Sequence, residues 1–417
     1  MTNCELLIIG NEIITGRILD TNSGFLAKKL FELGINLTRI TTINDKKESI
    51  EAGLKEALNR CDLIITSGGL GPTPADNTTA VAAKIFNQRL DLDESLLAQI
   101  EKRFLKLNQK MPESLTKQAL VPQGAIILEN PCGIAPGLIL KQRIGELPEA
   151  QRFKILILLP GIPIELEKIF VTGVIPYLES SFSLTPLFSR TIRTTNITES
   201  EIFEKIARYF VHHKAVEVTY LPHYTGVDII IWTTQDKKLL TACEKEVVLR
   251  LKPYVYGFDT TNIEQVVGAS LKKKGLTLAT AESCTAGLVA DRITNVPGSS
   301  EYFIGGVVAY RNDIKKLICR VQQETLKKFG AVSKEVALEM AKGIKEHYKT
   351  DVGLACTGIA GPAGGTLEKP VGLVYLAIVT KHSAKYEERR FAGNRRMIKE
   401  QAAMAALDLL RRTLENQ

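Results

Sequence analysis

Two motifs typical of ligand-binding loops, one near each end of the chain, follow apolar runs of strand length. The first is GGLGPTPADNT at residues 68–78, and the second is TAESCTAG at residues 280–287. In α/β proteins, loops that follow parallel strands deliver backbone amides and catalytic side chains to a ligand. Two such loops in 417 residues predict two α/β domains with separate small-molecule sites.

The composition is that of a globular protein, with 45% hydrophobic and 24% charged residues. The most apolar runs, such as ILILLP, are too short to span a membrane. The seven cysteines form no CxxC pair, and the N-terminus has no secretion signal, so we expect a reducing cytoplasmic location. The net charge of +8 suits anionic small substrates as well as nucleic acid, but the Lys and Arg residues are dispersed, which favours an ordinary solvated surface.

The pattern of apolar runs predicts three regions. Residues 1–170 alternate strands and helices, which indicates parallel strands joined by right-handed crossovers. Residues 171–258 predict a small α+β unit, with a capping box at Thr198 and Glu201 and two strands around a turn at residues 223–226. Residues 262–417 return to alternating strands and helices. The expected fold is therefore α/β, with two three-layer α/β domains joined by a small α+β domain.

The N-terminal motif has the chemistry of a phosphate site. Glycines at 68, 69 and 71 allow tight turns that bring backbone amides against phosphate oxygens, and Thr78 could donate to the same group. Asp76 could hold a metal ion or a ribose hydroxyl, or it could cap a helix. Glu12 and Asp20 also follow a strand and are expected to converge with Asp76, as oxygen ligands that suit magnesium-like ions.

The C-terminal motif places Ser283 where a strand is expected to turn into a helix, whose N-terminal amides could stabilise an oxyanion. A serine nucleophile needs a base, and the five histidines lie outside motif-like settings. Lys315 is the candidate base, with Tyr310 expected to face the same cleft. The alternatives are that Ser283 caps a helix, that Lys315 is a surface charge, and that Cys284 is the nucleophile.

Two further segments predict substrate contacts in the C-terminal region. The loop TGIAGPAGG at residues 357–365 could bind a phosphate or an amide group. Arg395 or Arg396, in FAGNRR, could clamp a phosphate, or the pair could be a solvated helix start.

These motifs, taken in order, resemble the competence/damage-inducible CinA family. The N-terminal ones are GNEIITG, ILDTN, GGLGPTPADNT, NPCGIAPG and LPGIPIE, and the C-terminal ones include AESCTAG, PGSSEYFIGGVVAY, TGIAGPAGGT and KPVGLVY. The resemblance implies a molybdopterin-binding-like domain of ADP-ribose pyrophosphatase type at residues 1–170. It also implies a KH-like linker domain at 171–258 and a nicotinamide-nucleotide amidase domain at 262–417.

For the C-terminal domain, the resemblance implies hydrolysis of nicotinamide mononucleotide to nicotinate mononucleotide and ammonia, without a cofactor. Ser283 would attack the carboxamide, Lys315 would act as base, and Tyr310 would assist proton transfer. The implied substrate-binding residues are Thr285, Thr357, Gly358, Gly361 and Arg395. Two positions depart from the family: Ala286 replaces a usual glycine, with small consequences expected because alanine suits a helix, and Asn394 replaces a usual aspartate.

For the N-terminal domain, the resemblance implies metal-dependent hydrolysis of ADP-ribose. Glu12, Asp76 and Glu165 would hold a divalent ion, magnesium or a cobalt-like ion, with potassium as a further ion. Gly68, Gly69, Gly71 and Thr78 would bind the substrate. Ala75 and Asn11 stand where the family often has acidic residues, and fewer carboxylates predict weaker metal binding and weaker hydrolysis.

The middle region contains no GxxG loop, the element with which KH domains hold single-stranded nucleic acid. A spacer or a contact surface in a homodimer is therefore the preferred interpretation. Two alternative functions for the whole chain remain: a nucleotide- or pterin-binding protein that handles a molybdenum cofactor, and a non-enzymatic competence accessory protein that binds DNA.

Overall fold

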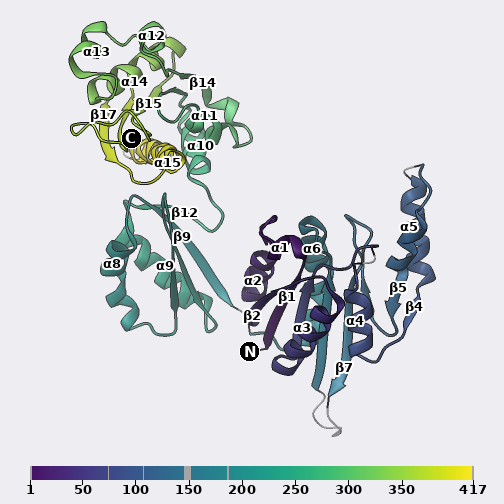
Figure 1. Cartoon of the computed structure of the whole chain (residues 1–417). Coiled ribbons are helices and arrows are strands. Elements are labelled where there is room, and N and C mark those ends of the chain that lie inside the picture. Colours follow the sequence, from purple (N-terminus) through teal and green to yellow (C-terminus); the bar gives the residue numbers. More distant parts are fainter. Residues whose placement is uncertain (1, 74, 107, 145–151, 186, 416–417) are drawn as a thin grey trace. The chain divides into compact units, whose positions relative to one another are not determined.

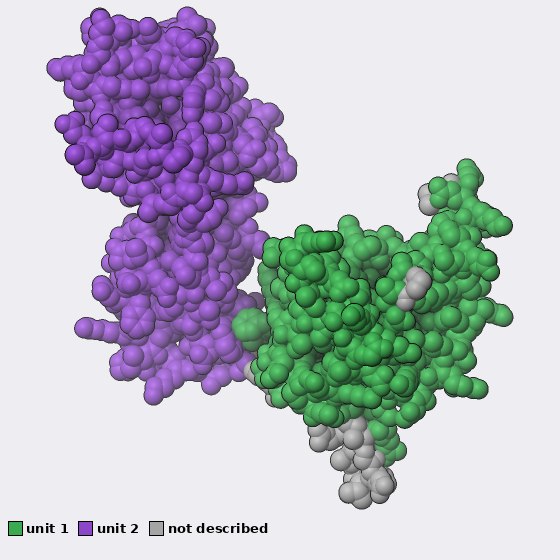
Figure 2. Space-filling view, in the orientation of Figure 1, with its two compact units in different colours: residues 1–187 green, residues 188–417 purple. Residues whose placement is uncertain are grey.

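The chain forms two compact units, Met1–Leu187 and Phe188–Gln417 (Figure 2). The computed structural model describes residues 2–73, 75–106, 108–144, 152–185 and 187–415. Three main sheets, each with its own helices, lie in these units (Figure 1). The expected architecture, two α/β domains and a small α+β domain, is confirmed.

The first unit is built on a six-stranded sheet in the order β2-β1-β3-β8-β7-β6. Strands β2, β1, β3 and β8 are parallel, as the alternating pattern predicted, whereas β7 and β6 add an antiparallel edge that the sequence did not reveal. The strands are β1 (Asn3–Ile9), β2 (Asn36–Ile43), β3 (Leu63–Ser67), β6 (Ile126–Leu128), β7 (Gly137–Ile144) and β8 (Arg152–Leu159), and a separate pair comprises β4 (Leu90–Leu92) and β5 (Leu120–Pro122).

Helices cover both faces of this sheet and make three layers. The helices are α1 (Asn11–Ile14), α2 (Asn22–Glu32), α3 (Lys47–Arg60), α4 (Thr78–Ile85), α5 (Glu94–Lys106), α6 (Pro163–Ile169) and α7 (Ile175–Ser181), with a 3₁₀ turn at Glu113–Ala119 and a π turn at Phe170–Val174. Helices α3, α4 and α5 pack on one face, and α2, α6 and α7 on the other. Because Val174 and Leu178 are buried in the second of these cores, the first unit continues to Leu187 rather than ending at residue 170.

The second unit begins with an antiparallel sheet in the order β10-β11-β9-β12. Its elements are β9 (Phe188–Thr195), α8 (Glu199–Val211), β10 (Glu217–His223), β11 (Gly226–Thr233), α9 (Lys237–Leu251) and β12 (Val255–Phe258). Ile192 and Ile229 from the sheet pack with Ile202 and Val247 from the two helices. The capping box of Thr198 and Glu201 is present at the start of α8, as predicted.

The rest of the second unit is a five-stranded sheet in the order β14-β13-β15-β16-β17, in which β14, β13 and β15 are parallel. The strands are β13 (Leu278–Glu282), β14 (Phe303–Val308), β15 (Val352–Gly358), β16 (Leu373–Val379) and β17 (Ala384–Arg390). The helices are α10 (Ile263–Lys274), α11 (Leu288–Thr294), α12 (Asn312–Leu317), α13 (Gln323–Phe329), α14 (Lys334–Tyr348) and α15 (Arg395–Glu415). Helices α10, α11 and α15 pack on one face and α13 and α14 on the other, so this domain also has three layers.

A polar network joins the two sheets of the second unit. Asp408 of α15 is 1% exposed and accepts hydrogen bonds from Arg411, Arg412 and Asn196, the last of which follows β9. Arg411 also donates to the carbonyl of Pro253. Because these groups are buried and paired, α15 is anchored to the small antiparallel domain.

All seven cysteines are free thiols. Among the helices in the described part of the chain, none combines the length and the apolar character needed to cross a membrane.

Candidate active site

Ser283 and Lys315 form the central pair of the C-terminal domain. Ser283 directly follows β13, and Lys315 extends from α12 so that its Nζ lies 3.1 Å from Ser283 Oγ. The same Nζ donates to the carbonyl oxygens of Ala309, at 2.6 Å, and Tyr310, at 3.1 Å. Lys315 is only 1% exposed, so the alternative that it is a surface charge is wrong.

Burial lowers the pKa of Lys315, because the charged form loses hydration, although the thiols of Cys319, Cys284 and Cys356 act in the opposite direction. A lysine with a lowered pKa spends more time neutral, and a neutral amine can accept a proton. The pair therefore has both the geometry and the electrostatics that a serine nucleophile with a lysine base requires.

Ser283 lies in a turn and not at the start of a helix. Helix α11 begins only at Leu288, and Gly287 is its N-cap. The carboxylate of Glu282 accepts from the amides of Gly287, Val289 and Ala290, so the first amides of α11 are already bonded. The expectation that these helix amides hold the oxyanion is therefore wrong.

The turn that carries Ser283 has left-handed backbone at two consecutive residues, Ala286 with φ of 52° and Gly287 with φ of 93°. A Cβ atom disfavours this conformation, whereas glycine adopts it freely. Ala286 is thus not a comfortable helical residue, as the sequence had suggested, but a residue in a conformation that glycine would accept at lower cost.

Two threonines predicted to bind substrate have buried hydroxyls with protein partners. Thr285 Oγ1 donates to Glu282 Oε2 at 2.7 Å, and Thr357 Oγ1 donates to the carbonyl of Ala331 at 2.8 Å. Thr285 lies two residues after Ser283, and Thr357 lies in β15, which pairs with β13. Their hydroxyls nevertheless bond to protein groups of the surrounding loops.

Cys284 is poorly suited to be the nucleophile. Its hydrogen bond with Cys356, together with burial, raises the pKa of Cys284. Cys284 therefore stays a protonated thiol, which is less nucleophilic than a thiolate. Its side chain is buried, and the lysine nitrogen contacts Ser283 Oγ. The geometry therefore favours Ser283 over the cysteine alternative.

Arg395 connects the other predicted C-terminal elements. As the first residue of α15, it donates from Nη1 to the carbonyl of Gly361 at 2.5 Å and from Nη2 to the Tyr310 hydroxyl at 2.8 Å. Tyr310 is 56% exposed, and it is its carbonyl, not its hydroxyl, that contacts Lys315. Gly358 ends β15, where an added Cβ would come within 2.6 Å of Val374. The glycine-rich loop, Tyr310 and Arg395 thus contact one another, and the Tyr310 carbonyl links them to Lys315.

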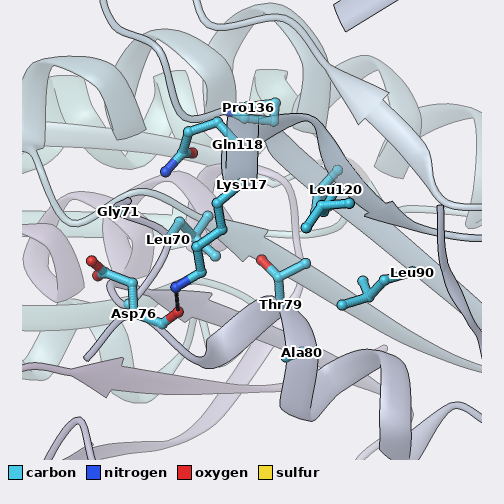
Figure 3. Close-up of a pocket in the computed structure, with 12 residues that line it drawn as sticks. Leu70, Gly71, Asp76, Thr79, Ala80, Leu90, Lys117, Gln118, Leu120 and Pro136 are labelled. Atoms are coloured by element: carbon cyan, nitrogen blue, oxygen red, sulfur yellow. Dashed lines mark hydrogen bonds between the residues drawn. The ribbon is translucent and has the colours of Figure 1, made fainter. Parts of the chain in front are cut away.

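In the N-terminal domain, the sequence motifs converge around one cavity of about 810 Å³. Its lining includes Glu12, Asp20, Gly68, Gly69, Gly71, Asp76 and Glu165. A smaller cavity, about 60 Å³, shares Gly69, Gly71 and Asp76 with it (Figure 3). A cavity of several hundred Å³ that is lined by glycines and carboxylates suits a small polar molecule.

Asp76 closes the loop in which it lies. Its Oδ2 accepts from Thr73 N at 2.9 Å and from Thr73 Oγ1 at 2.6 Å, so it does not cap α4. Lys117 donates to the carbonyl of Thr73 at 2.7 Å. It also donates to the carbonyl of Asp76 at 2.6 Å (Figure 3). Gly71 is required here, because a Cβ would lie 2.5 Å from Asp76 Oδ2.

Thr78 is fully buried, and its hydroxyl donates to the carbonyl of Gly68 at 3.1 Å. A Cβ on Gly69 would come within 2.1 Å of that hydroxyl, which explains the glycine. Thr78 therefore shapes the loop, whereas the sequence had suggested that it donates to phosphate.

Comparisons with known proteins find relatives of all three regions of the chain. Three domain families match: the probable molybdopterin binding domain at residues 5–180, the damage-inducible protein CinA KH domain at 189–257, and the CinA C-terminal domain at 260–414. A CinA-like protein of Kosmotoga olearia is 41% identical over 417 residues, which cover 98% of each chain. A putative competence-damage inducible protein of Caldicellulosiruptor saccharolyticus is 40% identical, with 99% of each chain covered.

The chain belongs to the CinA family. Among solved structures, the competence/damage-inducible protein CihA of Agrobacterium tumefaciens matches 37% of this chain and 94% of its own, with 40% identity and a TM-score of 0.36. The molybdopterin biosynthesis enzyme MoaB of Thermus thermophilus matches 43% of this chain and 94% of its own, with 18% identity and a TM-score of 0.29.

The metal ligands expected for this CinA-family chain line one cavity, but they are not grouped closely enough to coordinate one ion. Glu165 Oε2 accepts from Asn130 Nδ2 at 2.7 Å, and Asp76 is bonded to Thr73. Within residues 2–415, apart from the undescribed gaps, no three His, Cys, Asp or Glu side chains form a group that could hold a metal ion. The carboxylates have the right chemistry for a divalent cation, but as placed they do not fit one.

The sequence missed two residues that shape the CinA-family loops. Glu282 fixes the turn that carries Ser283, and Lys117 fixes the loop that carries Asp76. For Glu282, the signal was an acidic residue at the end of a strand, directly before the candidate nucleophile Ser283. Lys117 gave no such signal, because it lies 41 residues from Asp76 in the chain.

Proposed function

We propose that the C-terminal domain is a serine amidase that hydrolyses nicotinamide mononucleotide to nicotinate mononucleotide and ammonia. The observation that carries this proposal is the 3.1 Å contact between Lys315 Nζ and Ser283 Oγ, made by a lysine that is almost fully buried. Family membership supports this substrate, as does the cationic side chain of Arg395, which suits a phosphate.

In this proposal, Lys315 acts as a neutral base. A neutral amine has two hydrogens and one lone pair, and the carbonyls of Ala309 and Tyr310 can accept the two hydrogens. The lone pair is then left for the hydrogen of Ser283 Oγ. Two backbone carbonyls thus orient the base without a histidine.

The reaction then proceeds in two halves. Ser283 Oγ attacks the carboxamide carbon while its proton passes to Lys315, and the tetrahedral intermediate collapses as Lys315 returns the proton to the departing ammonia. Water next attacks the acyl-serine, Lys315 takes the water's proton, and the same proton returns to Ser283 Oγ as nicotinate mononucleotide leaves. Arg395 would hold the phosphate of the substrate throughout.

Ammonia release from nicotinamide mononucleotide by the full-length chain tests this function. We expect release that survives EDTA and that is abolished in Ser283→Ala while the circular dichroism spectrum is unchanged. Full activity in Ser283→Ala would show that the serine mechanism is wrong. No release from the unaltered chain would show that nicotinamide mononucleotide is not its substrate.

For the N-terminal domain, the second proposal is binding of ADP-ribose in the 810 Å³ cavity, with hydrolysis of its pyrophosphate as the associated activity. A divalent ion, magnesium or cobalt-like, and potassium are proposed additions. Because Glu12, Asp76 and Glu165 do not form a group that fits a metal, no step is assigned to one. Calorimetric titration with ADP-ribose, with and without Mg²⁺, tests this proposal. Binding of a molybdopterin and not of ADP-ribose would favour the pterin-handling alternative.

A homodimer and a cytoplasmic location remain proposals that rest on the family resemblance and on the free thiols. Light scattering of the purified chain tests the first. DNA binding at low salt would favour the competence accessory alternative, since phosphate contacts weaken steeply as salt rises.

A further inference from the structure

Glu282 is a buried carboxylate with an unusual number of partners. It is 2% exposed, and its Oε2 accepts from Thr285 Oγ1 at 2.7 Å and from the amides of Gly287 and Val289 at 3.0 Å each. Its Oε1 accepts from the amide of Ala290 at 2.8 Å. One side chain therefore accepts four hydrogen bonds, which come from the turn at Thr285, from its end at Gly287 and from the start of α11.

These contacts hold the Ser283 turn from both sides. Glu282 is the last residue of β13, and its partners at Val289 and Ala290 are in α11, so the carboxylate joins the strand before Ser283 to the helix after it. A negative charge at a helix N-terminus is favourable, and hydrogen bonds to a carboxylate are stronger than neutral ones. The left-handed backbone at Ala286 and Gly287 is held in place by the same bonds.

Lys315, by contrast, is positioned independently of Glu282. Its nitrogen is held by the carbonyls of Ala309 and Tyr310, which lie between β14 and α12. The relative placement of the two reacting groups therefore depends on how firmly the Ser283 turn is fixed. Arg395 is also separate, since its partners are Gly361 and Tyr310.

We propose that Glu282 is a positioning residue that sets the distance between Ser283 Oγ and the base. The proposal rests on the serine amidase function, because it assigns Glu282 a part in that reaction. In this role, Glu282 positions Ser283 and does not position Lys315 or Arg395. Loss of its charge should therefore slow the chemical step and leave substrate binding through Arg395 intact.

Glu282→Gln is the most informative variant, because it keeps the shape of the side chain. It replaces one acceptor oxygen with an amide NH₂ group, which would face the hydrogen-bond donors that the carboxylate now accepts from. We expect kcat for nicotinamide mononucleotide to fall about 10²-fold, as for a small misplacement of reacting atoms, with KM within about twofold. Thr285→Val removes one of the four donors and should give a smaller loss of kcat. A purely structural role would lower the amount of folded enzyme. The kcat and KM of each folded active site would then stay unchanged.

Glu264→Gln is the matched control. Glu264 is also a carboxylate tied to α11, through a 3.0 Å ion pair with Arg292, but it does not contact the Ser283 turn. Its loss should leave kcat unchanged. A kcat loss in Glu264→Gln as large as in Glu282→Gln would overturn the proposal, because any weakening of α11 would then suffice.

A readout that does not need the natural substrate separates this proposal from the amidase function. A sulfonyl fluoride reacts when Ser283 Oγ attacks sulfur, fluoride leaves, and Lys315 takes the proton, and peptide mass spectrometry locates the product. Slower labelling in Glu282→Gln supports the positioning role even if nicotinamide mononucleotide is not hydrolysed. Equal labelling rates and equal kcat in Glu282→Gln and the unaltered chain would overturn it. If Glu282→Gln does not fold, the same comparison is made with Thr285→Val, and unaltered labelling and kcat there would count against the proposal.

Discussion

The guanidinium of Arg395 donates a 2.8 Å hydrogen bond to the hydroxyl of Tyr310, a residue 85 positions earlier in the chain. The same guanidinium holds the carbonyl of Gly361. One exposed cation therefore links the start of α15, the glycine-rich loop and the segment that leads to Lys315. It lies where a phosphate on the substrate could exchange for one of these neutral partners.

Replacement of Arg395 by Met should weaken binding of the nucleotide phosphate. A hydrogen bond to a charged group contributes about 1.5–3 kcal/mol, so KM for nicotinamide mononucleotide should rise at least about tenfold. Nicotinamide riboside, which lacks the phosphate, should be affected much less. Arg396→Met, at the exposed neighbouring position, is the control, and a larger effect there would reassign the phosphate contact to Arg396.

The amidase rate should depend on the ionisation of Lys315. Burial lowers its pKa, and only the neutral amine can accept the serine proton, so kcat should rise with pH through that lowered pKa and then level off. Lys315→Ala should cost about 10²–10⁴-fold in kcat and remove this pH dependence. Lys316→Ala removes a neighbouring exposed lysine that is hydrogen-bonded to Gln323. This variant should retain both the kcat and the pH dependence of the unaltered chain. A pH profile unchanged in Lys315→Ala would exclude Lys315 as the base.

The Tyr310 hydroxyl should matter less than the Tyr310 carbonyl. Tyr310→Phe keeps the carbonyl that orients Lys315 and loses only the contact with Arg395. We therefore expect a loss of kcat well below that of Lys315→Ala, measured as ammonia release at saturating substrate. An equally severe loss would support direct proton transfer by the hydroxyl, as the family resemblance implies.

Glycine at position 286 should stabilise the protein. Ala286 has φ of 52°, and a left-handed alanine costs about 1–2 kcal/mol, which the greater freedom of unfolded glycine offsets in part. The free energy of unfolding in urea should therefore rise by up to about 1 kcal/mol in Ala286→Gly. Ala290→Gly, inside α11, should instead lower it by about 1 kcal/mol.

Lys117 should control ligand binding in the N-terminal domain alone. Lys117→Met removes the bonds to Thr73 and Asp76 that hold the glycine-rich loop, and ADP-ribose affinity should fall at least about tenfold, or ~1.4 kcal/mol. Ammonia release by the C-terminal domain serves as the internal control and should not change. Lys84→Met, at an exposed lysine that pairs with Glu51, should leave ADP-ribose affinity unaltered.

Asp408→Ala should destabilise the second unit strongly. Arg411 is 2% exposed, and removal of its buried partner leaves an incompletely paired charge, at a cost of about 3–5 kcal/mol in unfolding free energy. Glu415→Ala removes the partly exposed partner of the same arginine and should cost less than about 1 kcal/mol. Similar losses in the two variants, measured by chemical denaturation, would show that burial of Asp408 is not decisive.

Local sequence was sufficient for most regular elements. Apolar runs such as residues 153–159 predicted buried strands, and the Thr198–Glu201 capping box correctly marked the start of α8. Strand β7 was not predicted, because it contains the polar sequence KQR. Its pairing with β8 and β6 depends on these neighbouring strands rather than on the pattern of its own residues. Antiparallel additions to an α/β sheet are therefore the part of the topology that the pattern did not predict.

Periodicity and short motifs are local properties of the chain, so they predicted most helices and strands, the family resemblance and the chemical types of the candidate site residues. The folded structure was needed to show that Lys315 is buried against Ser283, that Thr78 and Thr285 have protein partners, and that Glu282 accepts hydrogen bonds from the start of α11. A hydrogen-bonding side chain takes a partner that lies within about 3 Å. Which partner that is depends on the path of the turn and, for Lys315 and Ser283, on packing between segments that lie 32 residues apart in the sequence.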